Sequence, residues 1–208
     1  MGLINDGVFH GCGVNCGSRN QFHLREDILE SIYARLRFMT QSFQRVMLLR
    51  YDLRFPAHFR FENGEESLKK FMNYFSIFLK RKGVVYQYVW VRERNHSDNV
   101  HYHCVFFIDA NWHMRSDKFN QEAQHIWSRI CSDASFRAPR SLLHVCEMNQ
   151  FEDLFTRHVM LAKDEPFFED AFSDCFYWVS YLAKVKTKIE NPGRGSRGWG
   201  CSKCDTCD

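Results

Sequence analysis

Two strand-like runs separated by a short polar segment constrain the fold of this chain more than any other feature. Residues 84–93 are dense in β-branched and aromatic side chains, and residues 100–109 form a second, strongly apolar run. Both compositions are typical of β-strands. The intervening residues 95–99, Asn-His-Ser-Asp-Asn, suit a hairpin loop. We therefore expect an antiparallel hairpin, in which a loop centred on the serine places Glu93 directly across from His101.

His101 and His103 lie two residues apart in the second run, so both side chains point to one face of the predicted strand. Cross-strand partners have Cβ atoms roughly 5 Å apart, and Glu93, His101 and His103 can therefore converge on one metal ion. Two other interpretations stay open. The histidines can cap a sheet or line a wet cleft, and Glu93 can be a solvated charge paired with Arg92 or Arg94.

A tyrosine-bearing helix is expected over residues 174–190. Its polar stripe falls at i, i+4, i+7 and i+11 and consists of Tyr177, Tyr181, Lys184 and Lys188. An apolar stripe about 100° around the helix consists of Trp178, Leu182, Val185 and Ile189. We expect the apolar stripe to be buried and the polar stripe to present phenols and ammonium groups. Taken alone, a tyrosine pair at the edge of a core is a more common arrangement than a catalytic one.

Five short segments together carry a family resemblance: 50–56 (RYDLRFP), 90–93 (WVRE), 101–103 (HYH), 180–184 (SYLAK) and 198–202 (GWGCS). With them the chain resembles the HUH endonucleases, which are named for two histidines that flank a hydrophobic residue. More narrowly, it resembles the inovirus-type replication initiators grouped with the YagK/YfjJ C-terminal domain family, from about residue 45 to 203. One departure is that relatives with two tyrosines often have a lysine between them, whereas residues 177–181 (YWVSY) have none.

The resemblance implies an α+β fold, an antiparallel sheet backed by helices, and a metal-dependent, site-specific endonuclease and strand transferase for single-stranded or origin DNA. Tyr181, which carries the Tyr-x-x-Lys spacing, would attack the scissile phosphate and leave a 5′-phosphotyrosine and a free 3′-hydroxyl. Tyr177 is either a second nucleophile or a packing residue. Lys184 either stabilises phenolate or phosphate charge or is a surface lysine. Mn²⁺ or Mg²⁺ suits the predicted mixed imidazole and carboxylate ligands.

The biological task implied by the resemblance is to start rolling-circle replication of a phage, prophage or related mobile element. No ATPase motif is present, so a host helicase and polymerase are expected partners. An HUH transposase or relaxase would use the same residues on another substrate. A relative that only binds DNA, as a regulator, is the alternative from a different class.

The net charge of +3 is mild, so local clusters matter more for DNA binding than overall charge. We expect phosphate contacts from basic residues near the two motifs: Arg92, Arg94, Lys186, Lys188, Arg194 and Arg197. The clusters at residues 69–70 and 80–82 are as consistent with a solvated face as with a DNA contact.

We expect three segments: an N-terminal one at 1–40 with a loosely ordered start (residues 1–20), the endonuclease domain at 41–190, and a Gly/Arg/Cys-rich tail at 191–208. Helices are predicted at 26–40, 65–82 and 117–131, and further strands at 45–55 and 142–148. Nine cysteines, no apolar run of membrane-spanning length and no signal-peptide pattern predict a reduced, cytoplasmic protein without a membrane partner. A further metal site is an open possibility at the terminal cysteines Cys201, Cys204 and Cys207, together with Cys12 and Cys16.

Overall fold

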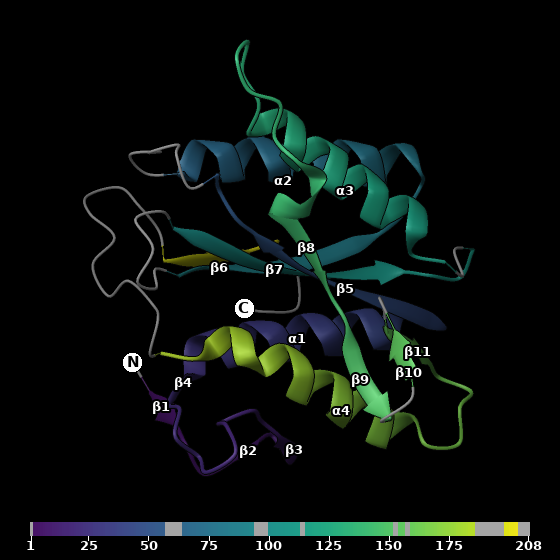
Figure 1. Ribbon diagram of the computed structural model, residues 1–208. Helices are drawn as coiled ribbons and strands as arrows, with labels where there is room; N and C mark the ends of the chain where they lie inside the picture. The colour runs from purple at the N-terminus through teal and green to yellow at the C-terminus, as the bar shows by residue number, and fades with distance from the viewer. Residues whose placement is uncertain are drawn as a thin grey trace.

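The computed structural model describes residues 2–56, 64–93, 100–112, 115–151, 154–156, 159–185 and 198–203, without the side chains of 149–156. Its centre is a six-stranded antiparallel sheet (Figure 1), whose strands are β5 (Arg45–Leu53), β6 (Tyr86–Glu93), β7 (His101–Asp109), β8 (Leu143–Cys146), β11 (Val159–Ala162) and β12 (Trp199–Cys201). The order is β11-β5-β7-β6-β12, and β8 also pairs with β5. β11 and β8 divide one edge of β5 between them, since β11 pairs with residues 45–48 and β8 with residues 50–53.

Two helices cover each face of the sheet (Figure 1). α1 (Glu26–Ser42) and α4 (Phe168–Ser180) lie on one face, and α2 (Glu65–Arg81) and α3 (Asp117–Ile130) lie on the other. Short helices η1 (Arg140–Leu142) and η2 (Tyr181–Ala183) lead into β8 and follow α4. Outside the main sheet, β1 (Leu3–Ile4) pairs with β4 (Leu24–Arg25), β2 (Val8–Phe9) with β3 (Cys12–Gly13), and β9 (Met148–Phe151) with β10 (Leu154–Thr156). No helix in the described ranges is long and apolar enough to cross a bilayer.

The alternation of side chains along β5 separates two cores. Met47, Leu49 and Tyr51 belong to the core under α2 and α3. Val46 and Leu48 belong to the core under α1 and α4. The next two positions on that second face are Arg50 and Asp52, so the apolar face of the sheet becomes polar at the end where β8 pairs with β5.

The α+β class, the antiparallel sheet and the helical backing are confirmed. Glu93 pairs directly with His101, as the predicted hairpin requires, although the loop itself lies outside the described residues. The predicted helices at 26–40, 65–82 and 117–131 correspond to α1, α2 and α3, and the strand at 45–55 to β5. The expected strand at 142–148 is divided into β8 and the start of β9.

Two expectations about elements are wrong. Residues 2–20 are not loose, because they form short strands whose Phe9, Cys12, Val14 and Cys16 side chains enter the core under α1 and α4. The tyrosine helix begins at Phe168 and ends at Ser180 instead of spanning 174–190. α1, mostly before residue 41, and β12, after residue 190, both pack into the same unit as the central segment.

Candidate metal and tyrosine site

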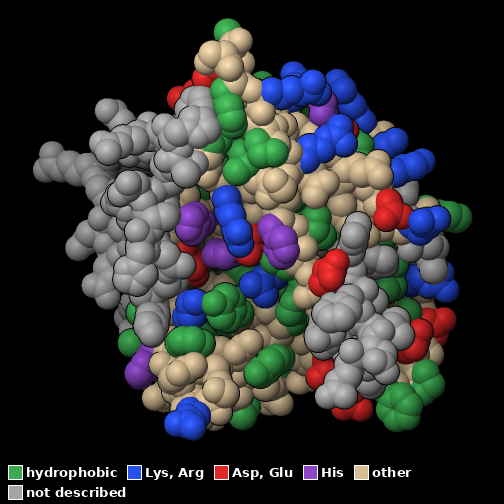
Figure 2. Space-filling model, in the orientation of Figure 1, with side chains coloured by type: hydrophobic (Ala, Val, Ile, Leu, Met, Phe, Trp, Pro, Cys, Tyr) green, Lys and Arg blue, Asp and Glu red, His purple; other side chains and the backbone are tan. Residues whose placement is uncertain are grey.

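His103 lies between two carboxylates on the polar end of the sheet. Its strand β7 runs between β5 and β6, with Asp52 opposite His103 on one side. Nδ1 of His103 is 2.5 Å from Oδ1 of Asp52, and Nε2 is 3.2 Å from Oε2 of Glu93. The Glu93 side chain is only 3% exposed. In the same view as Figure 1, Figure 2 shows histidines gathered with basic and acidic side chains near the middle of the surface.

Burial and hydrogen bonding shift the pKa values of Asp52, His103 and His101. Although burial favours its neutral form, the hydrogen bond from His103 lowers the pKa of Asp52 to about 2. Burial also opposes a charged imidazole, but the hydrogen bonds to Asp52 and Glu93 raise the pKa of His103. Burial, followed by the charges of His103 and Arg54, lowers the pKa of His101. The pKa values of the neighbouring histidines are therefore shifted in opposite directions, downward at His101 and upward at His103.

Two of the three expected ligands, His103 and Glu93, are in contact, whereas the described group of three that brings its donor atoms within 4.8 Å of one another is Asp52, His144 and Cys146. A ligating histidine usually donates its other ring N–H to a carboxylate, which fixes the ring, and Asp52 occupies that place on Nδ1 of His103. Nε2 is then the nitrogen directed toward Glu93. His101 lies on the same face and pairs with Glu93 across the strands. Glu93, His101 and His103 would hold the ion, and Asp52 would orient His103 without being a predicted ligand.

The catalytic tyrosine predicted from the sequence lies just after α4, in η2. Nζ of Lys184 is 2.5 Å from the hydroxyl of Tyr181 and 4.2 Å from the centre of its ring. Lys184 is only 7% exposed, so it is not the surface lysine of the alternative interpretation. The two residues do not share a helical stripe, because η2 ends at Ala183 and the backbone of Lys184, with a ψ of 128°, is not helical. The expected stripe fails for this reason, but two of its four members, Tyr181 and Lys184, are still in contact.

Arg50 joins the tyrosine segment to the strand that carries Asp52. Its Nη1 donates to the carbonyl oxygen of Trp178 at 3.1 Å, and its guanidinium carbon lies 5.2 Å from the centre of the Tyr181 ring. A cation at the C-terminal end of a helix is favourable because the helix dipole is negative there. Arg50 and Asp52 are two residues apart on one face, about 6.8 Å along the strand. Tyr181 therefore lies over the same end of the sheet as the His103 group.

The remaining predicted site residues differ in their placement. Tyr177 is 46% exposed, and its ring lies 3.7 Å from where a Cβ on Gly13 of β3 would be. Arg92 is 6% exposed and alternates away from Glu93 onto the other face of β6, and its DNA contact stays a prediction. The other expected phosphate contacts lie outside the described residues: Arg94, Lys186, Lys188, Arg194 and Arg197. The same is true of Cys204 and Cys207, whereas Cys12 and Cys16 are buried in the core.

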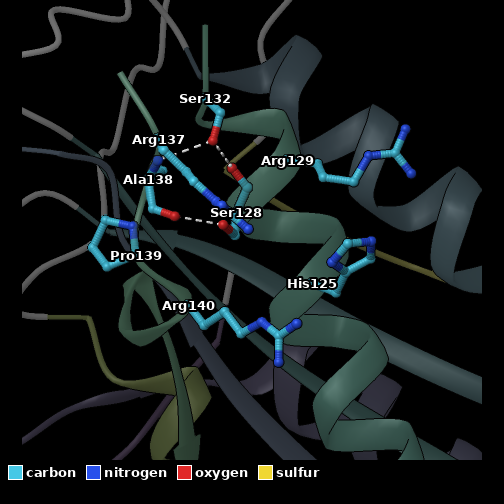
Figure 3. A pocket seen from close by; sticks show the side chains of 8 residues that line it. All are labelled: His125, Ser128, Arg129, Ser132, Arg137, Ala138, Pro139 and Arg140. Carbon is cyan, nitrogen blue, oxygen red and sulfur yellow. Dashed lines mark hydrogen bonds between the residues drawn. The ribbon is translucent and has the colours of Figure 1, made fainter. Parts of the chain in front are cut away.

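A basic pocket lies between α3 and the loop that connects this helix to η1 (Figure 3). The residues that line it are His125, Ser128, Arg129, Ser132, Arg137, Ala138, Pro139 and Arg140. Ser128 donates to the carbonyl oxygen of Ala138 at 2.5 Å, and Ser132 accepts from the Ala138 N–H at 2.9 Å. These bonds hold the loop against the helix, so that three arginines and a histidine border one hollow.

Three features of this site were not anticipated: Asp52, Arg50 and the basic pocket. The first two lie in the segment Arg50-Tyr51-Asp52-Leu53-Arg54, whose alternation of charged and apolar residues is the signal that one face of a strand becomes polar. The pocket depends on a loop that folds back on α3. Its arginines are spread over residues 129–140 without the density of a basic motif.

The fold and this polar site define an α+β protein with a histidine–carboxylate group and a lysine-paired tyrosine at one end of an antiparallel sheet. The chain belongs to the family described as the YagK/YfjJ C-terminal domain, whose model matches residues 13–202. It is 27% identical over 123 residues to the uncharacterized protein YfjJ of Escherichia coli (strain K12). That match covers 56% of this chain and 54% of the relative, so the chain spans about half the length of that protein. No solved structure matches.

Proposed function

We propose that this protein is a metal-dependent endonuclease of the HUH type that cuts one DNA strand and remains covalently attached to it. The observation that carries the proposal is that two separate sets of residues lie over one end of the sheet, on the side of Arg50 and Asp52. One set is the carboxylate–His103–carboxylate group, and the other is the Tyr181 hydroxyl held by Lys184. A protein that only bound DNA would need neither a buried acid beside an imidazole nor a phenol paired with an ammonium.

The chemistry follows from these groups. The Tyr181 oxygen would attack the scissile phosphorus, and the bond from phosphorus to the 3′ oxygen would break, which leaves a 5′-phosphotyrosine and a 3′-hydroxyl. The Lys184 ammonium, donating to that oxygen, would stabilise the phenolate as it forms. A bound Mn²⁺ or Mg²⁺ would supply polarisation of the phosphoryl oxygen. The bond energy is retained in the adduct, so the strand can later be rejoined, and the 3′ end can prime a polymerase.

A substrate strand would need basic surface beside the site, and the α3 pocket offers it. Arg140 belongs to that pocket and precedes His144 of β8 by four residues, so their Cα atoms are at most about 14 Å apart. His144 in turn pairs with Asp52. A DNA strand could therefore pass from the pocket over β8 to the site. The resemblance to inovirus-type initiators supports initiation of rolling-circle replication as the biological task.

Cleavage of labelled single-stranded DNA from the element that encodes this protein tests the proposal. We expect wild type to nick in Mn²⁺ and to stop in EDTA, and His103→Ala to lose cleavage while it retains most of its DNA affinity. His10→Ala is the matched control, because His10 is a solvent-exposed histidine that also contacts a carboxylate, that of Glu30. Full cleavage by His103→Ala would contradict the metal site.

A further inference from the structure

β8 repeats, on the other side of β5, the arrangement that β7 presents to β6. His144 and Cys146 are two residues apart on β8, so their side chains share one face of the sheet. Asp52 is the direct cross-strand partner of His144. A pair of donors at i and i+2 with an acid opposite one of them is also the pattern of His101, His103 and Glu93. The sheet thus carries two similar donor sets on one face.

The three side chains of the second set are close enough to share an ion. One donor atom from each of Asp52, His144 and Cys146 lies within 4.8 Å of the other two. Nδ1 of His144 is 3.7 Å from Sγ of Cys146. Cys146 is 8% exposed and His144 is exposed, so the group has a buried thiol at its base and an opening to solvent.

Asp52 links the two sets, because it is a donor in the second and the hydrogen-bond partner of His103 in the first. Its Oδ1 accepts from His103, but a carboxylate has two oxygens with about four acceptor positions. The second oxygen can therefore serve the β8 pair while the first continues to orient His103. Occupancy of one set would in this way affect the orientation of a ligand in the other.

We propose that Asp52, His144 and Cys146 form a second cation site, distinct from the one expected at Glu93, His101 and His103. A thiolate, an imidazole and a carboxylate select a borderline-soft divalent ion such as Zn²⁺ or Co²⁺ over Mg²⁺. Binding would replace the thiol proton of Cys146, which is released to solvent, so the site would fill less readily as the pH falls. A fourth position would be left for water or another ligand.

The ion itself is the probe. Metal-free full-length protein is titrated with Co²⁺, and both the number of bound equivalents and the thiolate-to-cobalt absorption band are recorded. We expect Cys146→Ser to lose one equivalent together with part of the band. We expect His144→Ala, a change at an exposed side chain that the fold should tolerate, to weaken that equivalent by at least tenfold.

The matched control is Cys131→Ser. Cys131 is also a buried thiol, at 2% exposure, but it lies in the core on the opposite face of the sheet, and its loss should leave the titration unchanged. Unaltered stoichiometry and band in both Cys146→Ser and His144→Ala would overturn the proposal. Because metal binding is measured and not cleavage, the result is independent of whether the protein is a nuclease.

Discussion

The contact between the Lys184 ammonium and the Tyr181 hydroxyl, 2.5 Å long, couples the positive charge of a buried lysine to a phenol. Such a charge–hydroxyl hydrogen bond is about twice as strong as a neutral one. It becomes stronger still when the hydroxyl acquires negative charge, which is the condition for an effect on rate.

We therefore expect Lys184→Met, which keeps most of the side-chain volume, to slow formation of the covalent adduct by about 100-fold, the usual loss for one such donor. The cut position and the DNA affinity should be unchanged. Lys163→Met, at an exposed lysine, is the control, and single-turnover rates in Mn²⁺ are the measurement. A Lys184→Met rate equal to that of wild type would assign Lys184 a packing role only.

The predictability of the site also differs from residue to residue. Glu93 could be placed opposite His101 because a short loop fixes the register of a hairpin. Asp52 could not be placed, since β5 and β7 are joined through α2 and β6, and local sequence does not determine which strands of a sheet become neighbours. The contact of Tyr181 with Lys184 was predicted for the wrong reason, as it depends on a turn and not on a helical stripe.

Among the elements, α4 and the N-terminal strands act together to hold the tyrosine. α4 buries Phe172, Cys175, Phe176 and Val179, an i, i+3, i+4, i+7 stripe. Ser180 accepts a hydrogen bond from the Asn15 N–H at 2.8 Å, and the Val185 N–H donates to the His23 carbonyl at 2.9 Å. Residues 15–24 therefore support the chain just after α4, in place of a further turn of α-helix. Because this support comes from residues distant in sequence, the sequence of residues 174–190 alone does not predict where the helix ends.

The pocket beside α3 leads to a prediction about DNA binding. Arg129 and Arg140 are exposed and border that pocket, so replacing both with alanine should leave the fold intact and weaken single-stranded DNA binding. If each contacts one phosphate, the slope of log affinity against log salt should fall by about 1.4. Arg115→Ala, at an exposed arginine paired with Asp117, is the control in a fluorescence anisotropy titration. An unchanged slope would remove the pocket from the DNA path.

For the molecule as a whole, the segment at residues 198–203 closes the sheet beside β6. β12 pairs with residues 89–91, and the Ser202 backbone N–H donates to the Tyr88 carbonyl at 3.0 Å. Nε of Arg35, on α1, donates to the Ser202 carbonyl at 3.1 Å, so α1 is tied to the same edge. Two parts of the chain more than 160 residues apart thus belong to one structural unit. Composition alone does not predict this contact.

Gly200 tests how tightly that edge is packed. A Cβ at this position would lie 2.8 Å from the Trp90 ring, so Gly200→Ala must displace the strand or the indole. Overpacking of this kind typically costs about 1–3 kcal/mol of unfolding free energy. Gly13→Ala is the control, because its Cβ would meet only the Tyr177 ring at an ordinary 3.7 Å. Equal urea midpoints for Gly200→Ala and wild type would show that β12 accommodates the extra methyl group with no loss of unfolding free energy.

The central claim, that Tyr181 becomes covalently joined to DNA, is tested most directly by a denaturing gel of the protein with labelled single-stranded fragments that tile its own genetic element. Wild type, Tyr177→Phe and Tyr181→Phe are compared in Mn²⁺ and in EDTA. Our account predicts a Mn²⁺-dependent adduct that persists in Tyr177→Phe and is absent in Tyr181→Phe. An adduct that survives in Tyr181→Phe, or fragments that bind the wild-type protein without any adduct, would contradict it.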